Sequence, residues 1–95
     1  MITQPDAVRT VVVINPQGLH ARPADMLAKC AKQYSSQIEI VHLGERIDSK
    51  SILGLLTLAA VEGTELMFEA TGPDATAALD EIAKLFESQF GEAEE

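Results

Sequence analysis

The chain has 95 residues, of which 46% are hydrophobic and 23% charged, a composition typical of one small globular domain and not of a disordered chain. Its formal net charge of −8 argues against nucleic acid as the main partner. We find no apolar run long enough to insert into a membrane, no signal peptide, and a single cysteine, Cys30, that cannot form an internal disulfide, so a cytoplasmic location is expected.

Charge is distributed unevenly along the chain. Residues 1–61 carry six basic and five acidic side chains, whereas residues 62–95 carry one basic and ten acidic side chains. Five of the seven basic residues fall between positions 22 and 50. A basic face on an acidic protein favours an anionic ligand or an acidic partner, and a solvated face with an acidic tail is the simpler alternative.

The first half of the chain predicts a strand, a helix and a pair of strands. Residues 7–14 are rich in β-branched side chains and precede an Asn-Pro turn, which predicts a strand. Apolar residues then recur at helical spacing from Pro23 to Tyr34. Because proline is tolerated only in the first turn, this helix must begin near residue 20, with His20 at its start. Residues 37–43 and 46–48 predict two further strands.

The second half predicts a short helix, a strand and a long helix. Ser51 is a preferred N-cap residue and precedes the apolar segment 52–58. The side chains of residues 64–70 alternate between two faces, as in a half-buried strand. Residues 72–74 predict a turn and a helix cap. The long helix carries an apolar stripe that ends at Phe90, and we expect the acidic end, 91–95, to fray. The buried strand positions are Leu66, Phe68 and Ala70, and the helical stripe is Ala75, Leu79, Ile82, Ala83, Phe86 and Phe90.

The order β-α-β-β-α-β-α predicts an α+β fold, in which helices cover one face of an antiparallel sheet. We find no internal repeat and no linker. The chain is therefore expected to form a single domain over residues 1–95, with a core of about residues 7–90 and an acidic tail at 91–95.

The segment GLHARPA, residues 18–24, combines the parts of an anion site. The first turn of a helix has free N–H groups and a partial positive charge, and Arg22 adds a planar cation suited to phosphate. Histidine forms covalent intermediates near neutral pH. Together these parts are suited to accepting and holding a phosphoryl group on His20. A histidine that only flanks a helix, beside a surface arginine, is the alternative.

The other reactive side chains are interpreted as structural. His42 lies in a predicted strand with no acidic or cysteine companion at ligand spacing, and Cys30 lies at the edge of an apolar helical stripe. We find no P-loop, paired-carboxylate or metal motif, so neither a metal nor a cofactor is expected. The helix after Ser51 is apolar nearly all round, and we interpret Ile52, Leu53 and Leu56 as a partner-binding patch. Burial in the core is the alternative.

Two segments resemble the signatures of HPr, the histidine-containing phosphocarrier family of the bacterial phosphoenolpyruvate-dependent phosphotransferase system. GLHARPA at 18–24 resembles the active-site signature of this family, and DSKSILGL at 48–55 resembles the signature around its regulatory serine. The spacing from His20 to Ser51 and the order of elements also agree. The resemblance covers about residues 7–90.

The resemblance implies an open-faced β-sandwich of four antiparallel strands and three helices, and a monomer that is a stoichiometric carrier and not an enzyme. His20 would accept a phosphoryl group on Nδ1 from phosphorylated enzyme I and pass it to an EIIA-type acceptor. Arg22 would be the companion charge, and the backbone N–H groups of Ala21 and Arg22 would face the phosphate. Whether the carrier serves sugar transport, a nitrogen-related branch or a purely regulatory one stays open.

The resemblance also implies a partner surface and a regulatory site. Ser51 matches the position that HPr kinase/phosphorylase modifies in some members, and a cap without regulation is the alternative. A phosphate on an N-cap serine is tolerated by the helix, so we expect it to disturb docking more than folding. The implied partner surface consists of the apolar patch and a basic rim: Ile52, Leu53, Leu56, Lys29, Lys32 and Lys50.

Two interpretations belong to other classes of protein. A small acylphosphate hydrolase also uses an α/β sandwich with an arginine at a phosphate site, but no second glycine-rich anion loop occurs in this sequence. A pure interaction module would use His20 only as a helix-flanking residue.

Overall fold

Four strands form one antiparallel sheet in the order β1-β4-β2-β3. The computed structural model describes residues 4–92. Its strands are β1 (Ala7–Val12), β2 (Gln37–His42), β3 (Glu45–Asp48) and β4 (Glu65–Thr71). Its helices are α1 (Ala21–Lys32), α2 (Ile52–Leu58), α3 (Ala75–Glu87) and a short 3₁₀ turn, η1 (Gln89–Gly91).

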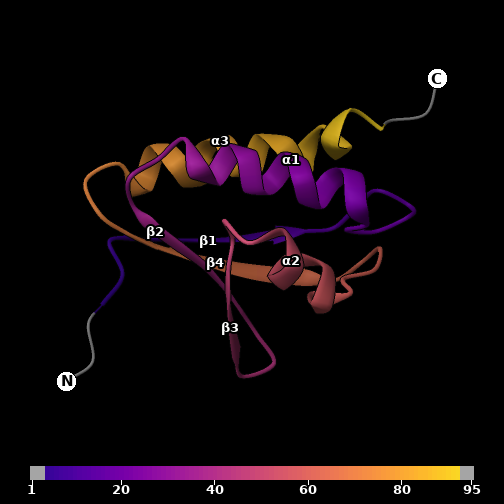
Figure 1. Cartoon of the computed structure of the whole chain (residues 1–95), viewed down its shortest axis with the longest axis horizontal. Coiled ribbons are helices and arrows are strands. Elements are labelled where there is room, and N and C mark those ends of the chain that lie inside the picture. The colour runs from indigo at the N-terminus through magenta and orange to yellow at the C-terminus, as the bar shows by residue number, and fades with distance from the viewer. Residues whose placement is uncertain (1–3, 93–95) are drawn as a thin grey trace.

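The helices lie on one face of the sheet, and the opposite face is open (Figure 1). This arrangement confirms the predicted open-faced β-sandwich. Strand β4 alternates as expected, since Leu66, Phe68 and Ala70 are all buried on the helical side. Phe68 is paired with Ile40 of β2, which is also buried. No helix within residues 4–92 has the length and apolarity needed to span a bilayer.

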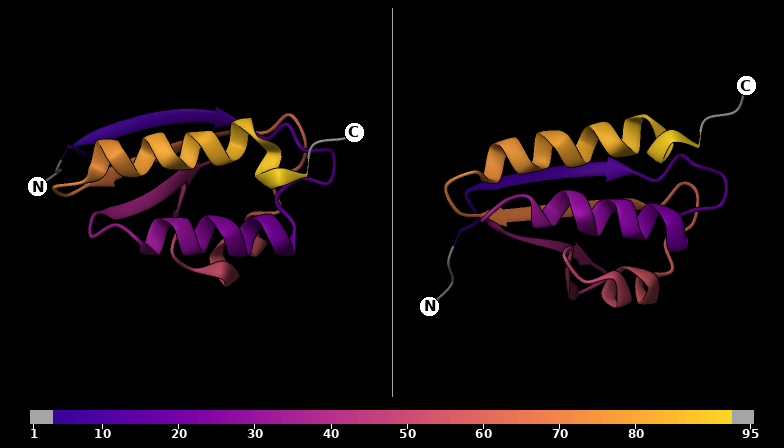
Figure 2. Two further views of the ribbon diagram at one scale, coloured as in Figure 1. Left: turned by 90° about the horizontal axis from the view of Figure 1, so that it is seen from above. Right: turned by 45° about the horizontal axis from the view of Figure 1, so that its top comes forward.

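Helices α1 and α3 run side by side over the sheet, and the end of α3 lies beside the start of α1 (Figure 2). Helix α1 directs its buried stripe, which includes Ala24, Leu27 and Ala31, toward the core. Phe86 of α3 contacts Phe68 edge to face, with ring centroids 5.8 Å apart. This packing fixes the two helix ends that meet at one edge of the molecule.

The apolar stripe of the last helix does not continue to Phe90 as one helix, and the sequence-based expectation is corrected here. Helix α3 ends at Glu87, and Phe90 adopts a left-handed backbone conformation within η1 (φ 53°). Its ring is fully buried against Phe86, with centroids 4.9 Å apart. Gln89 and Phe90 both adopt left-handed backbone conformations (φ 55° and 53°), and the buried Phe90 ring anchors this turn in the core.

The expectation that the acidic end frays is also wrong for Glu92. This residue lies in a turn, and its side chain is only 19% exposed. The turn follows from the burial of Phe90, because this anchor brings the next residues back toward the start of α1. Residues 93–95 of the expected tail lie outside the described residues.

A carboxylate clip joins the start of α3 to the loop between α1 and β2. Asp74 is the N-cap residue of α3 but makes no side-chain cap. Its carboxylate instead accepts hydrogen bonds from the backbone N–H groups of Ser35 and Ser36, both at 2.9 Å, and from the Ser36 hydroxyl. These hydrogen bonds, that of the Ser36 hydroxyl first among them, lower the pKa of Asp74 from 3.8 to about 2.

Candidate phosphoryl-accepting site

A tight loop places His20 at the beginning of α1. The Gly18 N–H donates to the Asn15 carbonyl at 3.0 Å, and the Asn15 side-chain amide donates back to the Gly18 carbonyl. Gly18 has a φ of +69°, and a Cβ at this position would collide with the Ala60 carbonyl. The next residue, Leu19, donates to that same carbonyl at 2.9 Å. Glycine is therefore required at position 18 both for its φ and for this close approach.

His20 is the N-cap residue of α1, as the position of Pro23 predicts. Its backbone is extended, its carbonyl accepts from the Ala24 N–H at 2.9 Å, and its side chain makes no cap hydrogen bond. The imidazole is thus free of the helix and 36% exposed. The N–H groups of Ala21 and Arg22 lie in the first turn, where no intrahelical acceptor exists, and Pro23 has none. The helix start leaves two backbone donors and a partial positive charge beside the histidine.

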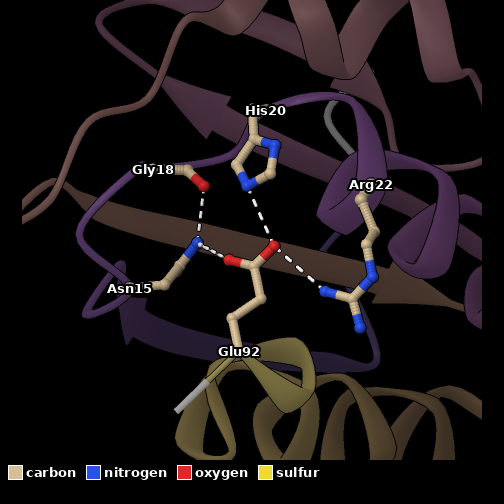
Figure 3. A network of polar contacts seen from close by, with 5 residues as sticks. All are labelled: Asn15, Gly18, His20, Arg22 and Glu92. Atoms are coloured by element: carbon tan, nitrogen blue, oxygen red, sulfur yellow. Dashed lines mark hydrogen bonds and ion pairs between the residues drawn. The ribbon is translucent and has the colours of Figure 1, made fainter. Parts of the chain in front are cut away.

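Three side chains converge on the carboxylate of Glu92 (Figure 3). Arg22 Nη1 donates to Glu92 Oε2 at 3.0 Å, and Asn15 Nδ2 approaches Glu92 Oε1 at 3.3 Å. His20 Nε2 lies 2.9 Å from Glu92 Oε2, although this buried ring nitrogen makes no aligned hydrogen bond. The site predicted from His20 and Arg22 therefore holds two further residues, Asn15 and Glu92.

Sequence reasoning missed both of these residues for identifiable reasons. Asn15 precedes Pro16 and the pair predicts only a turn, yet the Asn15 side chain is fully buried. Buried amides are rare without a hydrogen-bonding role, but burial is not visible in a loop sequence. Glu92 lies in an acidic segment whose composition predicts fraying, and only the burial of Phe90 brings it to the site.

The basic residues of the expected partner surface lie away from His20. Lys29 and Lys32 occupy the last turn of α1, about 13–18 Å along the helix axis from His20. Lys29 forms an ion pair with Asp25 at 3.1 Å, and Lys32 is exposed. Lys50 is half-buried and donates to the Tyr34 carbonyl at 2.8 Å. None of the three lysines is among the side chains that meet at the Glu92 carboxylate.

Helix α2 exposes part of its apolar surface. Leu53 is 76% exposed and Leu56 is 39% exposed, whereas Ile52 is half-buried against the core and Leu55 is fully buried. The apolar patch of three residues is therefore mainly a surface of Leu53 and Leu56, with Ile52 at its base. Helix α2 packs against α1 on the side away from α3 (Figure 2).

Ser51 caps α2 as the sequence predicts. Its Oγ accepts a hydrogen bond from the Gly54 N–H at 3.1 Å, and its side chain is half-buried. The cap occupies the hydroxyl oxygen as an acceptor and leaves its proton to other partners.

The remaining reactive side chains contribute nothing to the site. His42 ends β2 and is half-buried. Burial first, and then the charge of Glu81, raises the pKa of the Cys30 thiol, so the reactive thiolate is disfavoured. Within residues 4–92 we find no cluster of three potential metal-ligating side chains.

Comparison with known proteins gives one consistent result. The family model described as "PTS HPr component phosphorylation site" matches residues 7–88. Phosphocarrier protein HPr of Treponema pallidum is 42% identical over 85 residues, which cover 90% of this chain and 97% of that protein. Phosphocarrier protein NPr of Shewanella violacea is 40% identical, with 90% and 93% covered. The crystal structure of HPr-C-His from Thermoanaerobacter tengcongensis has a TM-score of 0.88 at 34% identity, with 93% and 99% covered.

Proposed function

The chain belongs to the HPr family of phosphocarriers of the phosphotransferase system, and we propose that it accepts a phosphoryl group from phosphorylated enzyme I on His20 and passes it to an EIIA-type acceptor. The observation that carries this proposal is the place of His20, partly exposed at the start of α1 with Arg22 two residues further on. The carrier is proposed to act as a monomer, as the resemblance to the family implies.

The accepting atom is Nδ1, the ring nitrogen that does not face Glu92. Its lone pair attacks phosphorus, the N–P bond forms, and the bond from phosphorus to its carrier atom on enzyme I breaks. The reverse sequence on an EIIA-type acceptor returns the lone pair to Nδ1, so the protein is unchanged after one cycle and acts as a carrier. The Ala21 and Arg22 N–H groups and the Arg22 guanidinium stabilise the phosphoryl oxygens.

The proposed partner surface combines a basic rim with an apolar patch. Exposed Leu53 and Leu56 supply the apolar contact, and Lys29 and Lys32 supply positive charge on the last turn of α1. Lys50 and Ile52 are half-buried and contribute less exposed area to this surface than Leu53 does. Acidic partner surfaces fit this combination, because complementary charge raises the rate of encounter while buried apolar side chains supply affinity.

Ser51 is the proposed regulatory position, modified by an HPr kinase/phosphorylase. It lies between Lys50 and the apolar patch, at the start of α2. A phosphate here adds about −1.5 to −2 charges at a helix N-terminus, where negative charge is tolerated. The same charge would repel an acidic partner, so modification acts on docking and leaves the fold intact.

The loading step is tested by intact mass after incubation with phosphoenolpyruvate, magnesium and enzyme I. The wild type runs beside His20→Ala and Ser51→Ala. We expect one acid-labile, base-stable phosphoryl group on the wild type and on Ser51→Ala, and none on His20→Ala. Absence of the group, with an enzyme I that loads another carrier, would remove the proposal. Steady turnover of an acylphosphate would favour the hydrolase. Normal function of His20→Ala in cells would favour the interaction module.

A further inference from the structure

The open face of the sheet, opposite the helices (Figure 1), carries apolar side chains as well as polar ones. Val11 of β1 is packed in the core, so the alternation of a strand places Val8, Thr10 and Val12 on the open face. Val8 is 53% exposed and Val12 is 41% exposed. This face is therefore not the uniformly polar surface that a sheet facing water usually presents.

The strand register joins these side chains into one patch. Thr10 of β1 is paired with Met67 of β4, and Met67 is paired with Val41 of β2. Met67 and Val41 are both half-buried and alternate with core residues on their own strands. Because directly paired side chains have Cβ atoms about 4.5–5.5 Å apart, the three are neighbours across three strands. We call the following five residues the sheet patch: Val8, Thr10, Val12, Val41 and Met67.

The rim of the sheet patch is acidic. On β4, Glu65 and Glu69 lie on either side of Met67 and share its face. Glu69 is paired with Glu39 of β2, which is paired in turn with Asp48 of β3. Three of the four carboxylates thus form one row across the sheet, although like charges on directly paired residues destabilise a sheet.

One cation lies within this row. The guanidinium of Arg46 on β3 lies 3.1 Å from Glu39 Oε1 and 2.9 Å from Glu69 Oε1. These contacts show that side chains of β2, β3 and β4 meet on the open face. Among the described residues, Glu65 and Asp48 form no ion pair. Four carboxylates therefore face one guanidinium, and the rim keeps an excess of negative charge.

We propose that the sheet patch is a second docking surface, which binds a protein segment whose apolar side chains are flanked by lysine or arginine. Such a segment matches both the apolar centre and the acidic rim. The acidic partners proposed for α1 and α2 are repelled here, because the rim has the opposite sign. A second copy of this chain presents the same acidic rim, so two sheet patches repel each other. The sheet separates the patch from α1, and an occupied patch leaves His20 accessible.

The probe for this surface is a synthetic amphipathic helix of leucine and lysine, and a leucine and glutamate helix of the same pattern is its control. Each peptide is titrated into the ¹⁵N-labelled protein while the backbone amide signals are followed. We expect the lysine peptide to shift the signals of β1, β2 and β4, with an affinity that falls as the salt concentration rises. The glutamate peptide should leave these signals unchanged.

Matched substitutions separate the sheet patch from the general negative charge of the protein. The double variant Val8→Thr, Val12→Thr keeps β-branched side chains in β1 and should bind the lysine peptide about five- to tenfold more weakly. Val61→Thr changes another exposed valine and should match the wild type. Glu65→Gln should weaken binding about two- to fivefold. Glu87→Gln makes the same change in charge at an exposed position of α3 and should keep the wild-type affinity.

Three results would overturn the proposal. Equal losses in the Glu65 and Glu87 variants would mean that the peptide reads only the net charge. Shifts confined to α1 and α2 would place the peptide on the other surface. A dimer in sedimentation experiments that the double threonine variant dissociates would assign the sheet patch to a second copy. Loading of His20 by enzyme I tests the carrier function separately, because these substitutions leave His20 and Arg22 unchanged.

Discussion

The side chains of Asn15 and Glu92, which are 77 residues apart in the chain, meet at 3.3 Å beside His20. Asn15 belongs to the loop that leads into α1, and Glu92 follows the turn anchored by Phe90. This contact ties the two ends of the sequence to the accepting histidine.

We expect the loading of His20 to depend on the planar guanidinium of Arg22 and not only on its positive charge. Arg22→Lys keeps one positive charge but loses the planar fork, and we expect loading from enzyme I to slow by about tenfold, as for the loss of one charge-assisted hydrogen bond. The rate is measured by intact mass at limiting enzyme I. Arg9→Lys is the matched control, since Arg9 pairs with Asp80 on another part of the surface. Equal rates in both variants would contradict the assigned role.

Gly18→Ala is expected to destabilise the protein through the loop that carries His20. The added methyl combines a left-handed φ with a collision against the Ala60 carbonyl, for a cost of about 2–4 kcal/mol. Gly63→Ala is the control, because its φ is also positive but nothing lies within 4 Å of the added Cβ. Its cost should stay near 1–2 kcal/mol, or roughly the left-handed penalty alone. Urea denaturation measures both, and equal losses would show that the contact with Ala60 is unimportant.

Substitutions at Ser51 separate its cap from its proposed regulation. Ser51→Ala removes the hydrogen bond to Gly54 and should cost about 1 kcal/mol of unfolding free energy. Ser51→Asn and Ser51→Asp both keep a capping oxygen, so both should unfold near the wild type. Only Ser51→Asp adds negative charge, and it should load more slowly from enzyme I than Ser51→Asn. If the two load at the same rate, charge at this position does not control docking.

Leu53 and Leu55 are neighbours on α2 with opposite surroundings. Leu53 is exposed and Leu55 is fully buried, so Leu53→Ala should change the unfolding free energy by about 0.5 kcal/mol or less, and Leu55→Ala by about 2–5 kcal/mol. We expect Leu53→Ala to weaken binding to enzyme I by about fivefold or more, as for the loss of an apolar interface side chain. Titration calorimetry measures the affinity. An unchanged affinity would place the partner elsewhere.

The carboxylate clip of Asp74 is expected to make the stability of the fold depend on pH in the acid range. Because the folded-state pKa of Asp74 is lowered from 3.8 to about 2, its stabilisation is present above its usual pKa and lost as pH falls from about 4 to 2. The wild type should melt above Asp74→Asn near neutral pH, and the difference in Tm should shrink over that acid range. Glu62→Gln, at an exposed loop position, should follow the wild type throughout. A difference that does not change with pH would show that the clip acts without ionisation.

The sequence predicts the fold and half of the site because both depend on local rules. Pro23 restricts the start of α1, which places His20 at the N-cap, and Ser51 marks the start of α2. The path after Ser88 could not be predicted, since the left-handed turn at Phe90 is favoured only by burial against Phe86. Glu92 reaches His20 through that turn, and this contact is therefore visible only in the folded chain.

The central claim, that this protein carries a phosphoryl group, is tested most directly by a complete relay. The protein is loaded from phosphoenolpyruvate through enzyme I, separated from both, and mixed with an unphosphorylated EIIA domain. We predict that intact mass shows the phosphoryl group leaving this protein and arriving on EIIA in equal amounts, while His20→Ala transfers none. Loading without transfer to any EIIA domain of the same organism, or release of the group only as inorganic phosphate, would contradict the account.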